Sequence, residues 1–145
     1  MPPVHYRPGT TFIELLVVLT LLGVLLAIAV TTGSAQIHRA AVHSAAREAT
    51  DAFAAARDHA LAHGTRSAVR INSANARLVV HSGSDTLARH LLGDVHRVQI
   101  ESSRDSMAYA PSGLGWGAAN LRLVIRRGAA AETVTVSRLG RVRRG

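Results

Sequence analysis

The chain has 145 residues, a formal net charge of +8 and no cysteine, and arginine supplies all 17 of its basic side chains. The lack of cysteine excludes a disulfide framework and any metal site built from thiolates. After an apolar N-terminal run is set aside, about 110 residues remain, which is enough for a single domain with a modest hydrophobic core.

Residues 1–9 are expected to form no regular element, because they contain three prolines. The stretch from Phe12 to Val30 that follows carries one charged residue, Glu14. An α-helix rises ~1.5 Å per residue, so this stretch is roughly 28 Å long, close to the ~30 Å hydrocarbon core of a bilayer. The sequence therefore predicts a transmembrane helix at about residues 12–30.

The single carboxylate of this stretch has two interpretations. At the bilayer centre a charged side chain costs about 2.5–3.5 kcal/mol, whereas near the end of a span it extends to the interface at lower cost. A membrane carboxylate without a partner in its own helix also marks a functional position. The residues alone leave both interpretations of Glu14 open.

After Thr31-Thr32 and Gly33-Ser34, apolar residues recur at steps of three and four, the spacing of an amphipathic helix. They are Val42, Ala45, Ala46, Ala49, Ala52, Phe53, Ala56 and Ala60. Gly64 is expected to end this helix as its C-cap residue. The pattern predicts one long helix over residues 10–63, with its first half in the membrane and its alanine-rich second half lying on a sheet.

From Arg66 onward the apolar period changes to two, which is typical of strands. Strands are predicted at 67–71 and 77–81, which form a hairpin, at 95–101, and at 121–125 and 133–136, which are joined around Gly128. The segment 86–92 remains ambiguous, and 111–117 is predicted to be a turn-rich loop. A helix followed by antiparallel strands is an α+β fold, with a β-rich domain over residues 64–145.

No catalytic constellation is visible, so we expect neither an enzyme nor a bound cofactor. The glycines at 113, 115 and 117 lack the strand–turn–helix context of a phosphate loop. His59 and His63 share a predicted helical face, but the sequence places no third ligand, so no metal site is expected. Trp116, the only tryptophan, is predicted to pack on the core, with stacking on a base or a partner as the alternative.

Basic residues concentrate at the C-terminus, where residues 122–145 hold seven arginines and one acidic residue. This distribution is typical of a polyanion-binding surface, but a solvated strand edge or a surface facing anionic lipid would also produce it. Gly140 permits a tight bend. If the segment after it is extended, Arg141 and Arg143 point to one side and Arg144 to the other, with Val142 turned inward.

The N-terminus resembles the type III signal of type IV prepilins. In that family a short basic leader ends in glycine, and a glutamate lies five residues later at the start of an apolar helix; these positions are Gly9 and Glu14 here. The family usually has phenylalanine where this chain has Thr10. The resemblance implies that a prepilin peptidase removes residues 1–9 by cutting between Gly9 and Thr10. It implies a role for Glu14 in assembly and leaves methylation of Thr10 open.

An ordinary secretory signal peptide is the competing interpretation. Arg7 supplies a charged start, and Ala27-Ile28-Ala29 supplies a small-x-small cleavage site. The apolar run is, however, longer than the about 7–15 residues of such a peptide, and Glu14 near its front is unexpected. We therefore favour the prepilin interpretation.

The order of elements resembles the GspH/FimT family of type IV pilin-like minor pilins and pseudopilins. Gly140-Arg141-Val142-Arg143 also matches the Gly-Arg-x-Arg motif associated with DNA binding in FimT-like pilins, with Arg138 and Arg144 beside it. The resemblance implies a structural subunit of a type II secretion pseudopilus or a type IV pilus, with other pilin or pseudopilin subunits as partners. It implies a single-pass inner-membrane protein with its C-terminal domain in the periplasm before assembly, and DNA binding for uptake as the alternative function.

Overall fold

The computed structural model describes residues 11–117 and 120–145, without the side chains of 29–32, so Gly9 and Thr10 lie outside the described residues. Helix α1 runs from Phe12 to His63. The chain divides into two compact units, Met1–Ser34 and Ala35–Gly145. In the first unit the side chains from Phe12 to Ile28 are exposed, and α1 is long and apolar enough to cross a bilayer.

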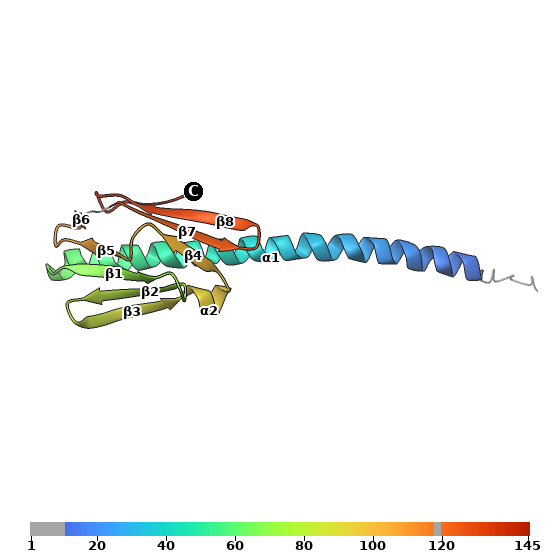
Figure 1. The fold of residues 1–145 in the computed structure, drawn as a ribbon, viewed down its shortest axis with the longest axis horizontal. Coiled ribbons are helices and arrows are strands. Elements are labelled where there is room, and N and C mark those ends of the chain that lie inside the picture. Colours follow the sequence, from blue (N-terminus) through green and yellow to red (C-terminus); the bar gives the residue numbers. More distant parts are fainter. Residues whose placement is uncertain (1–10, 118–119) are drawn as a thin grey trace, which may run out of the picture. The chain divides into compact units, whose positions relative to one another are not determined.

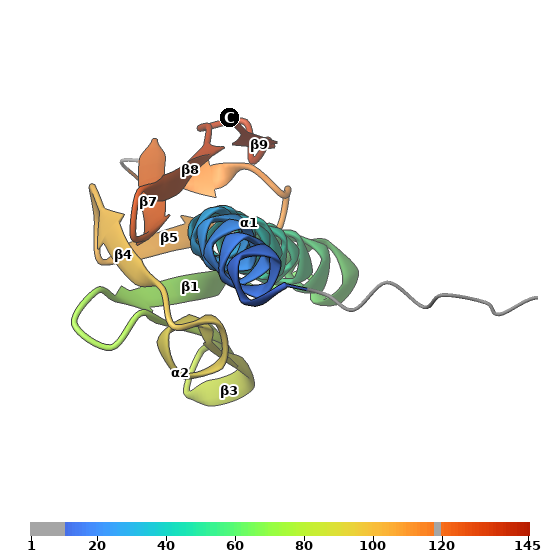
Figure 2. The same ribbon diagram turned by 90° about the vertical axis from the view of Figure 1, so that its right-hand side faces the viewer.

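The second unit combines residues 35–63 of α1 with two antiparallel sheets (Figure 1). The five-stranded sheet has the order β3 (Asp85–Leu91), β2 (Arg77–Ser82), β1 (Ser67–Asn72), β5 (Ser106–Tyr109) and β6 (Gly115–Trp116). The four-stranded sheet has the order β4 (Gln99–Ser102), β7 (Leu121–Arg127), β8 (Ala130–Val136) and β9 (Val142–Arg144). A short helix, α2 (Leu92–His96), connects the two sheets. In Figure 2, β1 and β3 lie below α1, while β7, β8 and β9 lie above it.

The core forms where the alanine-rich face of α1 meets both sheets. All eight residues of the predicted apolar stripe are buried, and the benzyl group of Phe53 is fully enclosed. The short alanine side chains of α1 share this core with Leu78, Met107 and Leu123 of the strands, which are also buried. The predicted α+β fold and the packing of the second half of α1 are confirmed. Gly64 ends the helix with φ of +62°, a left-handed conformation that glycine adopts readily.

The prediction of a strand over 95–101 is wrong in its first half. Val95 and His96 belong to α2, Arg97 follows with φ of +53°, and β4 begins only at Gln99. A Cβ on Gly93 would lie 2.7 Å from the carbonyl oxygen of Asn75, so the chain turns tightly here against the β1–β2 connection. The ambiguous segment 86–92 is strand β3 up to Leu91, after which buried Leu92 begins α2.

The prediction that Trp116 packs on the core is also wrong. Its side chain is 52% exposed, and it lies in the two-residue strand β6 at the edge of the five-stranded sheet. The guanidinium carbon of Arg66 stands 4.0 Å from the centre of the ring. A cation over an aromatic face is attracted by the ring quadrupole, so Arg66 covers part of a surface that the core does not reach.

Candidate functional site

Three exposed polar side chains form a row across the outward face of the four-stranded sheet. Arg122 of β7 lies opposite Thr135 of β8, and Thr135 lies opposite Arg143 of β9. Directly opposed residues point to the same face with Cβ atoms about 4.5–5.5 Å apart. The register of the three strands therefore places two guanidinium groups on either side of one hydroxyl.

This row borders a surface groove of about 610 Å³. Arg141 joins Arg122 and Arg143 along its lining, and Leu139 contributes an apolar wall. The other side chains that line it are Ser103, Asn120, Leu121, Thr135, Val136 and Ser137, so no lining residue is acidic. The groove therefore combines three permanent positive charges with hydroxyl and amide groups, a combination that suits an anion carrying several oxygens.

Gly140 shapes the bend that delivers Arg141 to the groove. Its φ is +72°, and a Cβ on this residue would collide with the carbonyl oxygen of Gly113. The bend is closed by a hydrogen bond from the backbone N–H of Gly140 to the carbonyl of Ser137, at 2.9 Å. Arg57 of α1 holds the Gly113 backbone beside this bend, because its Nε donates a hydrogen bond to the Gly113 carbonyl at 3.0 Å.

The remaining basic residues of the tail have other positions. Arg144 lies away from the groove, and its Nη1 is 3.9 Å from Oε1 of Glu132. Arg138 is exposed and does not line the groove, but its carbonyl accepts a hydrogen bond from the backbone of Gly115 at 2.9 Å. Val142 is half-buried against the core. Of the five residues proposed from the sequence, two line the groove, one shapes it and two lie outside it.

Arg122 is the one groove arginine that was not among the candidates from the sequence. It belongs to the basic C-terminal stretch but lies 19 residues before Arg141. The predicted hairpin around Gly128 was the sequence feature that could have identified Arg122. Pairing of Arg127 with Ala130 in that hairpin brings Arg122 opposite Thr135. The partner strand β9 was not predicted, so nothing in the sequence indicated that Arg143 completes the row.

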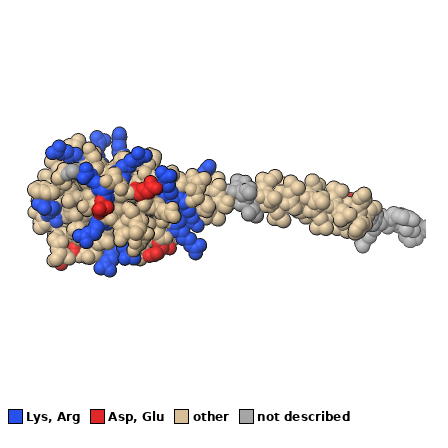
Figure 3. Space-filling view, in the orientation of Figure 1, with Lys and Arg blue, Asp and Glu red and all other residues tan. Residues whose placement is uncertain are grey.

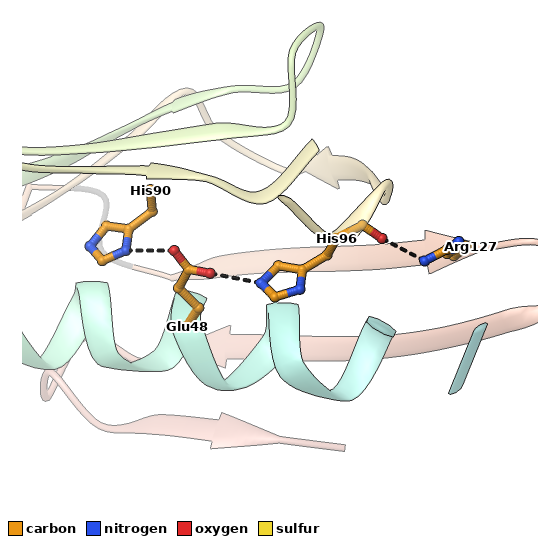
Figure 4. Close-up of polar contacts among 4 residues, drawn as sticks. All are labelled: Glu48, His90, His96 and Arg127. Carbon is orange, nitrogen blue, oxygen red and sulfur yellow. Dashed lines mark hydrogen bonds and ion pairs between the residues drawn. The ribbon is translucent and has the colours of Figure 1, made fainter. Parts of the chain in front are cut away.

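A second polar cluster joins four elements inside the domain, α1, β3, α2 and β7 (Figure 4). The carboxylate of Glu48 on α1 accepts one hydrogen bond from Nδ1 of His90 at 3.0 Å and another from Nε2 of His96 at 2.8 Å. Partial burial opposes ionisation of Glu48, but the hydrogen bonds and positive charge of His96 and His90 outweigh it and hold its pKa below the usual value. Arg127 of β7 donates to the His96 carbonyl at 2.9 Å. The cluster therefore acts as a cross-link between the helix and both sheets.

The other sequence candidates show no further chemistry. The rings of His59 and His63 are stacked with centroids 4.1 Å apart. Among the described residues, no group of three or more His, Cys, Asp or Glu side chains is placed to hold a metal ion. Glu14 lies in the first turn of α1, where its backbone N–H donates to the carbonyl of Thr11 at 3.1 Å. No ion pair of the Glu14 carboxylate is found within residues 11–117 and 120–145.

A long N-terminal helix whose second half packs on antiparallel strands is the type IV pilin-like fold. The chain matches the type IV minor pilin FimU of Pseudomonas aeruginosa with a TM-score of 0.62 and 14% identity, over 72% of this chain and 88% of that one. It matches the minor pseudopilin EpsH of the type 2 secretion system of Vibrio cholerae with a TM-score of 0.57 and 15% identity, over 72% and 95% of the two chains. Neither the comparison with protein-family models nor that with curated proteins found a match.

Proposed function

We propose that the protein is a minor pilin or pseudopilin of the GspH/FimT kind, a structural subunit of a type II secretion pseudopilus or a type IV pilus. The observation that carries the proposal is the run of exposed apolar side chains from Phe12 to Ile28 on the helix that continues into the domain. Such a surface is stable only in lipid or against other apolar helices. The likeness of the fold to one minor pilin and one minor pseudopilin supports the same role.

The N-terminus supplies the processing and assembly steps of this proposal. A prepilin peptidase removes residues 1–9 and leaves a free amine on Thr10. A free α-amino group is ordinarily protonated at neutral pH, so this amine is a suitable partner for the carboxylate of Glu14 on a neighbouring subunit. Before assembly the subunit is held in the inner membrane by one helix, with its C-terminal domain in the periplasm. Its activity is assembly, and it needs no catalytic group or cofactor.

Site-directed cross-linking tests the structural role. The chain has no cysteine of its own, so one cysteine introduced at an exposed position such as Leu19 reports contacts without background. We expect disulfide cross-links to other pilin or pseudopilin subunits that carry a matching cysteine in their N-terminal helices. A cysteine at exposed Ser84, in the β2–β3 turn, serves as the control. Absence of cross-links from the Leu19 position in cells that build the filament would overturn the proposed role.

DNA binding is the second candidate function, and the groove along Arg122, Arg141 and Arg143 favours it. Arginine forks bind phosphate oxygens in a bidentate manner, and phosphate contacts position a nucleic acid without reading its sequence. No aromatic side chain lines the groove, so base stacking does not contribute there. The groove therefore favours weak, sequence-independent binding to the DNA backbone.

A further inference from the structure

One end of the domain, next to residues 36–43 of α1, carries a second group of arginines that is separate from the groove. We call this group the basal arginines and define it as Arg39, Arg97, Arg126 and Arg127. Figure 3 shows basic side chains gathered at this end of the domain. The basal arginines come from α1, from the residue after α2, and from the end of β7.

Three contacts place these elements together. The β7–β8 turn abuts α1, because a Cβ on Gly128 would lie 2.6 Å from Nδ1 of His38. A shallow depression beside it is lined by Arg39, His43 and the first residues of β8. The hydrogen bond from Arg127 to the carbonyl of His96 joins the end of β7 to α2 and hence to Arg97.

Most of the positive charge at this end has no counter-charge. Among the described residues, Arg39 and Arg97 are exposed and make no side-chain hydrogen bond or ion pair. Arg126 approaches Glu101 only to 3.9 Å, and both side chains are more than half exposed. Arg127 donates to a neutral carbonyl, which leaves its charge uncompensated.

The acidic groups near this end are already engaged or few in number. Glu132 lies 3.4 Å from His43 and 3.9 Å from Arg144, and Glu48 is held by two histidines. Asp94 of α2 is exposed. Among the described residues, Asp94 and Glu101 are therefore the two acidic residues near this end that remain to offset the charge of the four arginines. The surface therefore has an excess of positive charge in a region that solvent reaches freely.

Arg97 also occupies a backbone conformation that favours glycine, with φ of +53° at the C-cap of α2. A side chain other than glycine or asparagine at such a position carries conformational strain. Within the part of the chain that the structure describes, its exposed guanidinium makes no hydrogen bond or ion pair that would offset this strain. The Arg97 guanidinium is therefore available to a partner outside the domain.

We propose that the basal arginines bind anionic lipid headgroups of the membrane that holds the N-terminal helix. This proposal rests on the proposed membrane anchor and adds a second contact to it. Eight residues separate Val30, the end of the predicted span, from Arg39, so the chain keeps this end of the domain within about 32 Å of the span. Basic side chains beside a membrane segment are attracted to anionic lipids over about a Debye length, which is ~8 Å at physiological salt.

The contact would hold the unassembled domain against the membrane surface. Leaving the membrane for the filament would then require the arginines to exchange lipid phosphates for water or for acidic groups of neighbouring subunits. Because the interaction is electrostatic, it weakens with salt and disappears when the lipid carries no net charge.

The test uses the full chain in nanodiscs made of phosphatidylcholine alone or of equal parts phosphatidylcholine and phosphatidylglycerol. A fluorophore on Ala129→Cys, in the β7–β8 turn beside the basal arginines, reports quenching by a quencher attached to lipid headgroups. A fluorophore on Ser84→Cys is the control, because the β2–β3 turn lies beside Thr65 at the other end of α1. We expect strong quenching at Ala129→Cys in the anionic nanodiscs only, and its loss at high salt.

A charge-matched pair of variants separates a specific surface from overall charge. The test variant carries Arg39→Gln, Arg97→Gln and Arg126→Gln, and the matched control carries Arg70→Gln, Arg89→Gln and Arg138→Gln, all at exposed positions. Each basal arginine removed should lower the ratio of docked to free domain by about fivefold, whereas the control should behave as wild type.

The results that would overturn the lipid contact differ from those that would also overturn the membrane anchor. Equal quenching in both kinds of nanodisc, or equal quenching in the test and control variants, would show that the basal arginines do not bind lipid while leaving the membrane anchor intact. Failure of the wild-type chain to enter nanodiscs would overturn the membrane anchor and the lipid contact together.

Discussion

The Nε2 atom of His96 lies 2.8 Å from Oε2 of Glu48, although the two residues are 48 positions apart in the chain. The other carboxylate oxygen accepts a hydrogen bond from His90 at 3.0 Å. His96 belongs to the short helix that connects the two sheets, and its own carbonyl is held by Arg127. One carboxylate on α1 thus fixes the connection between the sheets, and its ionisation contributes to the stability of the domain.

This arrangement predicts a pH dependence of unfolding. The pKa of Glu48 is lowered in the folded state, so its contribution is present above the unfolded value of about 4.3 and is lost as the pH falls through the folded pKa. We expect urea unfolding of Glu48→Gln to differ most from that of wild type near neutral pH. The difference should stay nearly constant above about pH 5 and shrink as the pH falls further toward the folded pKa. A difference that does not change with pH would contradict this role of Glu48.

Gly140→Ala should destabilise the domain more than a Gly→Ala substitution does at an ordinary glycine with a positive φ. At Gly140 the new methyl group faces both a φ of +72° and the backbone of Gly113. Gly83→Ala is the matched control, because its φ is +59° and nothing lies within 4 Å of the added Cβ. The control should lose about 1–2 kcal/mol and Gly140→Ala clearly more. Urea unfolding measures both, and equal losses would show that the Gly113 contact adjusts freely.

The groove makes a quantitative prediction for DNA. Each arginine that neutralises one phosphate contributes about 0.9 to the slope of log K against log salt concentration. We therefore expect Arg122→Gln, Arg141→Gln and Arg143→Gln each to lower that slope by about 0.9. Arg144→Gln is the control, because Arg144 lies beside Glu132 and outside the groove. Titrations of duplex DNA at several salt concentrations provide the slopes. If the variant lacking both Arg141 and Arg143 binds as wild type does at every salt, the groove is not a DNA site.

Glu14→Ala separates membrane insertion from assembly. Removing a carboxylate from an apolar segment lowers the cost of insertion, so the variant should enter the membrane at least as well as wild type. It should nevertheless be poorly incorporated into filaments, because the amine of the neighbouring Thr10 loses its partner. Membrane fractionation and sheared filament preparations measure the two steps. Normal incorporation of the variant would rule out this role for Glu14.

Processing after Gly9 predicts a mature chain that begins at Thr10 and retains the apolar helix. Gly9→Arg should block maturation, because it places a long charged side chain beside the bond to be cut, where glycine has none. Intact-mass measurement of the purified protein decides between the interpretations of the N-terminus. A mature mass that begins at Val30 would instead support a secretory signal peptide cut after Ala29.

The local part of this structure followed from the sequence alone. The steps of three and four between Val42 and Ala60 predicted both the second half of α1 and the face that it buries. Gly64 predicted its end, and the turn residues at 72–76 predicted the first hairpin. These features depend on backbone preferences and on the periods of helix and strand, which act between residues close together in the chain.

The contacts that matter for function were decided by the tertiary structure. Arg122 and Arg143 line the same groove only because β8 pairs with β7 on one side and with β9 on the other. Glu48 meets His96 only because α2 interrupts the predicted strand, and Trp116 is exposed because β6 forms the edge of its sheet. Pairing between distant strands depends on the closure of long loops and on how many side chains fill one core together. The types and local spacing of residues do not contain that information, so the sequence indicated a basic tail while the fold determined which arginines share a groove.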